Sequence, residues 1–172
     1  MTKQVKIGNV VIGGGNPVAI QSMANIKTSK IDDVVRQIAE LEVLGCDIIR
    51  VSVKDDDDVK ALSEIKKRIS IPLVADIHFN YKYALKAIDS GVDKIRINPG
   101  NIGSEKNVEE VAKALIHSDV AVRVGSNSGS IEKEFLAKYG RSEVSLAESA
   151  LKNVSALERY GVDKIVLSAK AS

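Results

Sequence analysis

Apolar and polar residues along this chain follow two alternating patterns. Short runs rich in Val and Ile, typical of strands that are buried on both faces, alternate with longer stretches whose apolar residues recur at i, i+3 and i+4, the spacing of an amphipathic helix. The short runs predict strands at 18–23, 48–53, 73–77, 94–98, 121–125 and 164–168. The longer stretches predict helices at roughly 30–44, 57–67, 81–90, 106–117 and 144–160.

A Gly-x-Asp motif joins helix to strand at three places, Gly45–Asp47, Gly91–Asp93 and Gly161–Asp163. The glycine is expected to end the helix in a left-handed cap, and a buried strand follows each motif. Such a repeat predicts a parallel sheet with right-handed crossovers. We therefore expect an α/β fold, a TIM-type (β/α) barrel truncated to about six βα units. An open doubly wound sheet is the alternative, but no Gly-x-Gly-x-x-Gly turn follows the first strand.

Two other segments have distinctive local patterns. Residues 5–12 alternate loosely and run into Gly13-Gly14-Gly15, which predicts a short N-terminal hairpin with a flexible turn. The triple glycine could also belong to a phosphate-binding loop, but this interpretation is less favoured because no Gly-Lys-Ser/Thr follows it. The charge run 55–58 is typical of a helix start, where carboxylates cap free backbone N–H groups; the alternative is a metal site, although four consecutive residues cannot all face one ion.

Length and composition restrict the kind of protein. The 172 residues allow one domain, with fewer residues than the roughly 250 of a complete eight-unit barrel. A hydrophobic content of 44% with 28% charged residues is typical of a globular protein, and a net charge of +2 does not indicate nucleic-acid binding. We find no long apolar run or signal peptide and expect a cytoplasmic protein without a membrane segment. The single Cys46 predicts neither an internal disulfide nor a structural metal site, and is expected to be a small buried residue.

Polar side chains gather where the predicted strands end. Residues two apart on a strand share a face, so we expect five pairs to point into the upper barrel interior, where such barrels keep their active sites. The pairs are Arg50 with Ser52, Asp76 with His78, Arg96 with Asn98, Arg123 with Gly125, and Ser168 with Lys170.

These pairs would bring four cations and one carboxylate into one cavity. Buried cations need compensation, and the simplest missing partner is an anionic ligand. Arginine suits phosphate, and three arginines with a lysine exceed what one monophosphate needs, which favours a diphosphate. Alternatively, each arginine pairs with a carboxylate on a neighbouring loop, and His78 is a hydrogen-bonded structural residue.

Several strings in this sequence resemble one family. Val74-Ala75-Asp76-Ile77-His78-Phe79, Arg96-Ile97-Asn98-Pro99-Gly100-Asn101-Ile102-Gly103, Arg123 to Ser130 and Ser168 to Ser172 resemble the 4-hydroxy-3-methylbut-2-enyl diphosphate synthases, the IspG or GcpE family. Gln21-Ser22-Met23 and Ile49-Arg50-Val51-Ser52 match as well. The likeness covers about residues 5–172 in the same order.

The resemblance implies an oxidoreductase of isoprene biosynthesis by the methylerythritol phosphate pathway. The family reductively opens 2-C-methyl-D-erythritol 2,4-cyclodiphosphate, with two electrons delivered through a 4Fe-4S cluster. By motif, Arg50, Arg96, Arg123 and Lys170 would hold the diphosphate, and a second set would contact hydroxyl groups or order the pocket: Asp76, His78, Asn98 and Asn127. Implied partners are an electron donor such as flavodoxin or ferredoxin and a second copy in a homodimer; no catalytic residue is assigned.

The sequence departs from this family in one respect. Family members continue into a cluster domain that supplies three Cys and a Glu, whereas this sequence has one Cys and so cannot hold such a cluster. We therefore expect residues 1–172 to be an incomplete N-terminal barrel domain, inactive alone, whose edges at 18–23 and 164–168 are covered by another chain or a swapped element. A dihydropteroate-synthase-like transferase and a stand-alone phosphometabolite-binding module are the alternatives.

Overall fold

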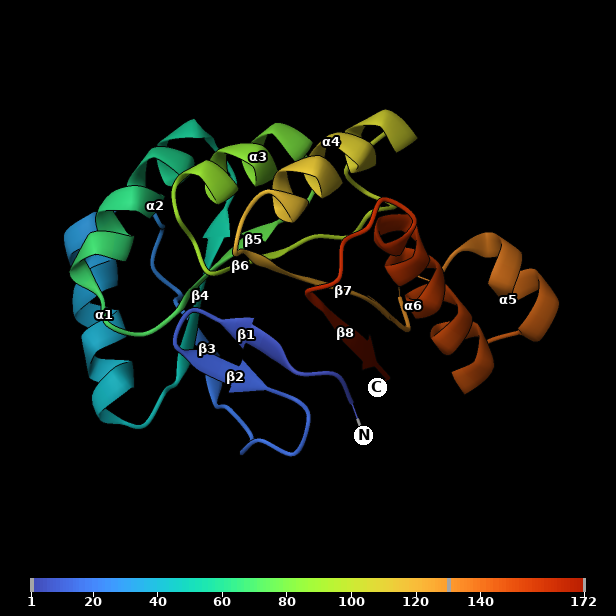
Figure 1. Ribbon diagram of the computed structural model, residues 1–172, viewed down its shortest axis with the longest axis horizontal. Coiled ribbons are helices and arrows are strands. Elements are labelled where there is room, and N and C mark those ends of the chain that lie inside the picture. The colour runs from blue at the N-terminus through green and yellow to red at the C-terminus, as the bar shows by residue number, and fades with distance from the viewer. Residues whose placement is uncertain (1, 130, 172) are drawn as a thin grey trace.

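A six-stranded parallel sheet forms the centre of the molecule in the computed structural model, which describes residues 2–129 and 131–171 (Figure 1). Met1, Ser130 and Ser172 lie outside the described residues, and the last two close two of the motif strings above. Each strand pairs with the next one along the chain, so the sheet is one side of a TIM-type barrel, as predicted. The strands are β3 (Gln21–Met23), β4 (Ile48–Val53), β5 (Leu73–Ile77), β6 (Lys94–Arg96), β7 (Ala121–Asn127) and β8 (Ile165–Lys170).

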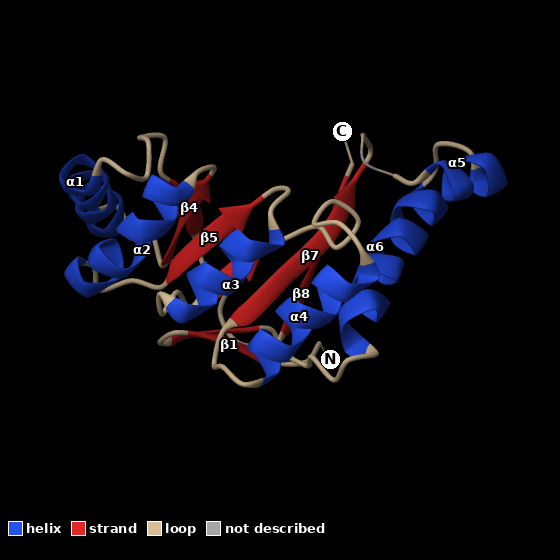
Figure 2. Ribbon diagram, turned by 90° about the horizontal axis from the view of Figure 1, so that it is seen from above, coloured by secondary structure: helices blue, strands red, loops and turns tan. Residues whose placement is uncertain are grey.

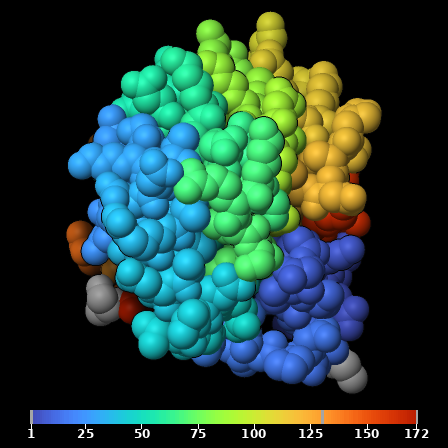
Figure 3. Space-filling model, turned by 90° about the vertical axis from the view of Figure 1, so that its left-hand side faces the viewer, coloured from blue at the N-terminus to red at the C-terminus, as the bar shows by residue number. Residues whose placement is uncertain are grey.

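Helices cover the convex face of this curved sheet (Figures 1 and 2). They are α1 (Ile31–Val43), α2 (Asp56–Arg68), α3 (Tyr81–Asp89), α4 (Glu105–Ile116) and α6 (Glu143–Glu158), whereas α5 (Lys133–Tyr139) lies outside this layer, beside α6. Successive units lie next to one another on the surface, from light blue to yellow in Figure 3. The sequence pattern did not predict α5, which packs on α6 and has no buried residue; its seven residues are too few for the i, i+3, i+4 spacing to recur.

The Gly-x-Asp motifs end helices and anchor strands. Gly45 has a φ of 91°, and the N–H groups of Gly45 and Cys46 donate to Glu42 and Leu41 in the pattern of a Schellman cap. Asp47 Oδ2 accepts the N–H of Ile20 just before β3, at 2.7 Å. Asp93 accepts the N–H of Leu73 in the same way, so in two of the three motifs the aspartate ties its own strand to the preceding one, a role that the sequence pattern did not indicate.

A hairpin closes the lower end of the half-barrel. Its strands β1 (Val5–Ile7) and β2 (Val10–Ile12) pair antiparallel, as predicted. The buried side chains of Val5 and Ile7 form an apolar cluster with the lowest inward residues of three strands, Ile48, Val74 and Ala121. This apolar floor separates the polar barrel interior from the lower face of the molecule.

The charge run at 55–58 begins α2, as predicted. Asp55 is the N-cap residue, and its side chain accepts the N–H of Asp58 at 2.9 Å. Asp58 is buried and accepts the N–H groups of Ser29 and Lys54, so it also fixes the loop that leads into α1. The run is thus a helix start with a tertiary anchor.

Strand ends differ from the predicted ones by a few residues. The first strand of the sheet covers only 21–23, because the segment before it lies outside the pairing register and leaves Val18 94% and Ile20 60% exposed. β6 ends two residues earlier than predicted, whereas β7 and β8 extend two residues further. Within the described sheet β3 and β8 have one neighbour each, and their coverage by another chain stays a prediction. None of the described helices is long and apolar enough to cross a membrane.

Candidate anion-binding site

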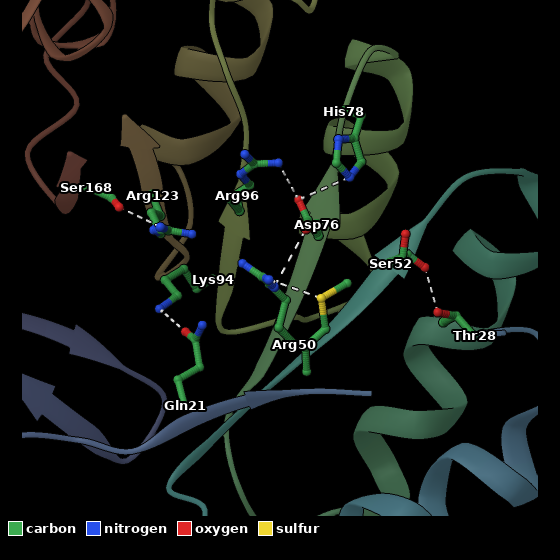
Figure 4. Close-up of polar contacts among 11 residues, drawn as sticks. Gln21, Thr28, Arg50, Ser52, Asp76, His78, Lys94, Arg96, Arg123 and Ser168 are labelled. Carbon is green, nitrogen blue, oxygen red and sulfur yellow. Dashed lines mark hydrogen bonds and ion pairs between the residues drawn. The ribbon is translucent and has the colours of Figure 1, made fainter. Parts of the chain in front are cut away.

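Alternate residues of the strands point into the barrel interior, which produces a polar layer above the apolar floor. On β4 the outward residues Ile49, Val51 and Val53 pack in the main core against the helices, so Arg50 points inward. The same alternation on the neighbouring strands directs further inward side chains toward the centre in Figure 4: Asp76, Arg96, Arg123 and Ser168. The predicted two-residue phase is confirmed.

Asp76 is the centre of the ion-pair network. Its side chain is 4% exposed, with Oδ1 3.0 Å from Arg96 Nη1 and 3.7 Å from His78 Nε2. Its Oδ2 lies 3.6 Å from Arg50 Nε (Figure 4). One buried carboxylate therefore orders side chains from three adjacent strands, as expected if the residue shapes a pocket.

Two arginines keep donors that no carboxylate satisfies. Arg50 Nε is buried and makes no hydrogen bond, while Nη2 of the same residue contacts Met23 Sδ at 3.0 Å, a weak acceptor. Arg123 Nη2 donates to Ser168 Oγ at 2.6 Å. Neither acceptor carries charge, so the positive charge of Arg123 has no direct carboxylate partner among the described hydrogen bonds and ion pairs.

A cavity of about 280 Å³ opens above this network. Six predicted site residues line it: His78, Arg96, Asn98, Arg123, Asn127 and Lys170. Asp76 lies beneath its surface, and Arg50 lines a second cavity of about 390 Å³ that shares Arg123 and Lys170 with the first. The prediction that four cations face one cavity is therefore corrected to two cavities with shared walls, because the register pairs Arg50 with Val74 and so places it one layer below Asp76 and Arg96.

The two asparagines belong to turns at the rim. Asn98 Oδ1 accepts the N–H of Gly100 at 3.0 Å, and Asn127 Oδ1 accepts the N–H of Gly129 at 2.9 Å. In both cases the side chain bonds the backbone two residues further on, which fixes the loop that follows the strand. The asparagines thus hold the rim of the cavity in place.

Lys94 is a fifth cation that the strand-end analysis missed. It lies two residues before Arg96, on the same inward face, and it lines the second cavity. Its Nζ donates to Gln21 Oε1 at 2.9 Å across the barrel interior, from β6 to β3 (Figure 4). The two-residue alternation places Lys94 on the inward face, but the sequence analysis considered only the pairs at the strand ends and therefore began at Arg96.

Mutual repulsion is visible in the pKa values of the cluster. Burial, together with the charges of Arg50 and Arg96, lowers the pKa of Arg123. The pKa of Lys170 is lowered chiefly by the charge of Arg123. Five cations and one carboxylate make a site that an anion would stabilise. Among residues 2–129 and 131–171, no three His, Cys, Asp or Glu side chains are grouped closely enough to hold a metal ion.

Sequence comparison identifies relatives of this chain. The model of the family described as the GcpE TIM-barrel domain matches residues 2–172. The 4-hydroxy-3-methylbut-2-en-1-yl diphosphate synthase (flavodoxin) of Caldanaerobacter subterraneus subsp. tengcongensis is 51% identical over 100% of this chain and 49% of its own length. The protein of the same name from Caldicellulosiruptor saccharolyticus is 52% identical over 100% of this chain and 50% of its own length. The chain therefore spans about half the length of the curated relatives it matches.

Solved structures with the same fold are more distant in sequence. The 7,8-dihydropteroate synthase of Vibrio fischeri ES114 superposes with a TM-score of 0.68 at 12% identity, over 95% of this chain and 65% of that one. The type I 3-dehydroquinate dehydratase of Clostridium difficile superposes with a TM-score of 0.63 at 19% identity, over 95% and 79%. At these identities the likeness shows the barrel fold alone, so it does not favour a dihydropteroate-synthase-like activity.

Proposed function

The chain belongs to the GcpE family, and from this premise we propose that it is the substrate-binding barrel of a reductase that converts 2-C-methyl-D-erythritol 2,4-cyclodiphosphate to 4-hydroxy-3-methylbut-2-enyl diphosphate. This reaction of isoprene biosynthesis consumes two electrons, opens the cyclic diphosphate and releases a hydroxyl group as water. Relatives about half identical to this chain carry that synthase name.

The excess of positive charge inside the barrel is the observation that supports this function. Arg96, Arg123 and Lys170 line one cavity, and Arg50 with Lys94 lines the adjoining one, yet neither cavity is lined by a carboxylate. The buried Nε of Arg50 has no hydrogen-bond acceptor. A diphosphate supplies several anionic oxygens and would compensate more of this charge than a monophosphate.

We assign different roles to the charged and the neutral side chains. Arg50, Arg96, Arg123 and Lys170 would bind the phosphoryl oxygens. Asp76 would hold the guanidinium groups of Arg50 and Arg96 in place through its ion pairs. The remaining rim residues would contact hydroxyl groups of the ligand or order the loops around it: His78, Asn98 and Asn127.

We propose that a 4Fe-4S cluster delivers the two electrons to the substrate in the working enzyme. The described residues do not fit such a cluster: the single Cys46 is buried beside Ile48, with its Sγ 3.1 Å from the Ile48 carbonyl oxygen. Cluster ligands would have to come from the part of the family's length that this chain does not match. The relatives' name includes flavodoxin, and we propose flavodoxin, or the similar carrier ferredoxin, as electron donor.

A titration with the cyclic diphosphate tests the binding role. We expect calorimetry to detect binding to the protein, and Arg123→Ala to weaken it by about tenfold to a hundredfold, because a charge-assisted hydrogen bond contributes about 1.5–3 kcal/mol. Arg159→Ala is the matched control, because Arg159 pairs with Glu105 on the outer surface with its side chain 54% exposed. Unchanged affinity in the Arg123 variant, or no binding to the parent, would contradict the proposal.

A turnover assay tests the catalytic role separately. Residues 1–172 supplied with iron, sulfide and a strong reductant should consume none of the cyclic diphosphate, because no described residue can carry electrons. A protein of the full length of the relatives should consume it. Turnover by residues 1–172 alone would show that the electron chemistry has been misplaced. Binding without turnover at either length would favour a phosphometabolite-binding module, which the same cationic cluster supports.

A further inference from the structure

The second cavity contains a buried lysine for which the proposed phosphate contacts have no role. Lys94 is 3% exposed and faces the barrel interior directly below the arginines. Arg50, Arg123 and Lys170 line the same cavity, and its walls include no carboxylate. Because Arg123 and Lys170 also line the upper cavity, Lys94 lies within the same electrostatic environment as the proposed ligand.

The groups that face Lys94 do not compensate its charge. Its Nζ donates to the side-chain oxygen of Gln21, which is neutral. Of the strands around it, β4, β7 and β8 present cations, β3 presents Gln21, and the floor below presents apolar side chains such as Ile12 and Ile48. The carboxylate on β5, Asp76, is already engaged by two arginines.

A purely structural role would be served better by an apolar side chain. Replacing a buried charge by a hydrophobic group of similar volume is often neutral or stabilising, whereas a buried cation without a counter-charge is costly. Burial and the charges of Arg123 and Arg50 lower the pKa of Lys94 from 10.5 to about 8. This position therefore weakens the folded protein unless something else compensates the ammonium group.

We propose that Lys94 is a fifth cation of the anion site, whose charge is compensated by the bound diphosphate, so that ligand binding is coupled to protonation of this lysine. The inference rests on the proposed function, because it needs an anionic ligand in the barrel. Lys94 would not contact the ligand directly but would raise the positive electrostatic potential beneath it.

The coupling has a definite sign. An anion bound above Lys94 favours the ammonium form and raises its pKa, so the protein takes up protons on binding when the pH is near the pKa of the free protein. Affinity should be highest below about pH 8 and should fall as the pH rises above that value. The cyclic diphosphate is a suitable probe, because each of its phosphoryl groups has one acidic proton, already lost at neutral pH.

Calorimetric titration of the cyclic diphosphate tests this coupling. Titrations at pH 8 in two buffers with different heats of ionisation give the number of protons taken up, and titrations at pH 7 give the affinity. We expect Lys94→Met to weaken binding about tenfold at pH 7 and to take up fewer protons than the parent. Lys60→Met, which removes an exposed lysine of α2 whose side chain is 76% exposed, should behave as the parent does.

Gln21→Glu provides a second variant that keeps every cation. The new carboxylate would face Lys94 at the position of the present hydrogen bond and would compensate its charge permanently. We expect weaker binding at pH 7 and a loss of proton uptake at pH 8. This variant decides the question if Lys94→Met fails to fold.

The outcomes separate this inference from the proposed function. If the parent binds the cyclic diphosphate, Arg123→Ala weakens binding as expected, and both Lys94→Met and Gln21→Glu keep the parent's affinity and proton uptake, only the role of Lys94 is overturned. If the parent does not bind, both proposals are overturned. Since Lys170 also titrates with a lowered pKa, proton uptake that is equal in the parent and Lys94→Met would assign the coupling to Lys170 instead.

Discussion

Asp76→Asn removes the carboxylate that holds the cationic cluster together, while leaving the size of the side chain almost unchanged. Arg96 Nη1 and Arg50 Nε lie 3.0 and 3.6 Å from its oxygens. An asparagine still offers one oxygen as an acceptor, but it cannot compensate either guanidinium charge. We expect the variant to fold with lower stability and a stronger response to anions.

The structure indicates how much unfolding free energy Asp76→Asn should lose. At an effective dielectric constant of about 20, unit charges at these distances attract by about 5 kcal/mol before the cost of desolvation. Measured losses on removing one partner of a buried ion pair are about 3–5 kcal/mol. The side chains of Arg50 and Arg96 are 20% and 29% exposed, so water screens part of their charge. We therefore expect the lower end, a loss of about 3 kcal/mol.

Thermal unfolding with and without inorganic diphosphate measures both effects. For a chain of this length the loss corresponds to a melting temperature lower by about 6–12 °C. Diphosphate should raise the melting temperature of Asp76→Asn more than that of the parent, because the variant has one more uncompensated positive charge. A tenfold tighter affinity would add about 1.4 kcal/mol of stabilisation at saturating ligand.

Asp119→Asn is the matched control, because the same substitution there breaks an exposed ion pair with Lys164 at 2.8 Å. We expect little change in its melting temperature and no change in its response to diphosphate. The reasoning is refuted if Asp76→Asn melts at the temperature of the parent, or if diphosphate stabilises the parent and the variant equally.

Three other predictions concern pH, packing and association. The pKa of Lys94 is about 8 in the folded chain and 10.5 when unperturbed, so the unfolded state binds more protons between these values. In urea titrations, the unfolding free energy of the parent should therefore rise by about 3 kcal/mol relative to that of Lys94→Met as the pH rises from 8 to 10.5. A difference between the two proteins that does not change with pH would contradict this prediction. A Cβ at Gly125 would lie 1.8 Å from the Ser168 carbonyl oxygen, so Gly125→Ala should lower the unfolding free energy by at least about 3 kcal/mol by forcing β7 away from β8. In Gly100→Ala the new Cβ meets only Asn98 Oδ1, at 3.3 Å, so the loss in the same assay should be much smaller. Leu167 is 48% exposed on the edge strand β8, so Leu167→Lys should reduce self-association of residues 1–172 in light scattering, and equal association by both chains would show that this edge is not used.

Local sequence patterns predicted the repeating units of the fold, because helix caps and strand alternation depend on residues that are close together in the chain. The bounds of β4 and β5 are the predicted ones, since each is a short, largely apolar run between two helices. Gly45, Gly91 and Gly161 all adopt the positive φ that the motif requires. The inward face of each strand followed from the two-residue alternation alone, which is why the phase of Arg50, Asp76, Arg96 and Arg123 could be predicted without a structure.

Only the tertiary structure decided which of these side chains meet, because strand register and curvature set distances across the barrel. Asp76 binds Arg50 and Arg96 from the strands on either side, while the register pairs Arg50 with Val74 and so leaves it in a lower cavity than the other predicted contacts. Lys94 and Gln21 are 73 residues apart in sequence and on strands that are not neighbours in the sheet, so no local pattern connects them. The sheet must curve before the two can form a hydrogen bond, and this curvature is a property of the packed helices and the hairpin floor together.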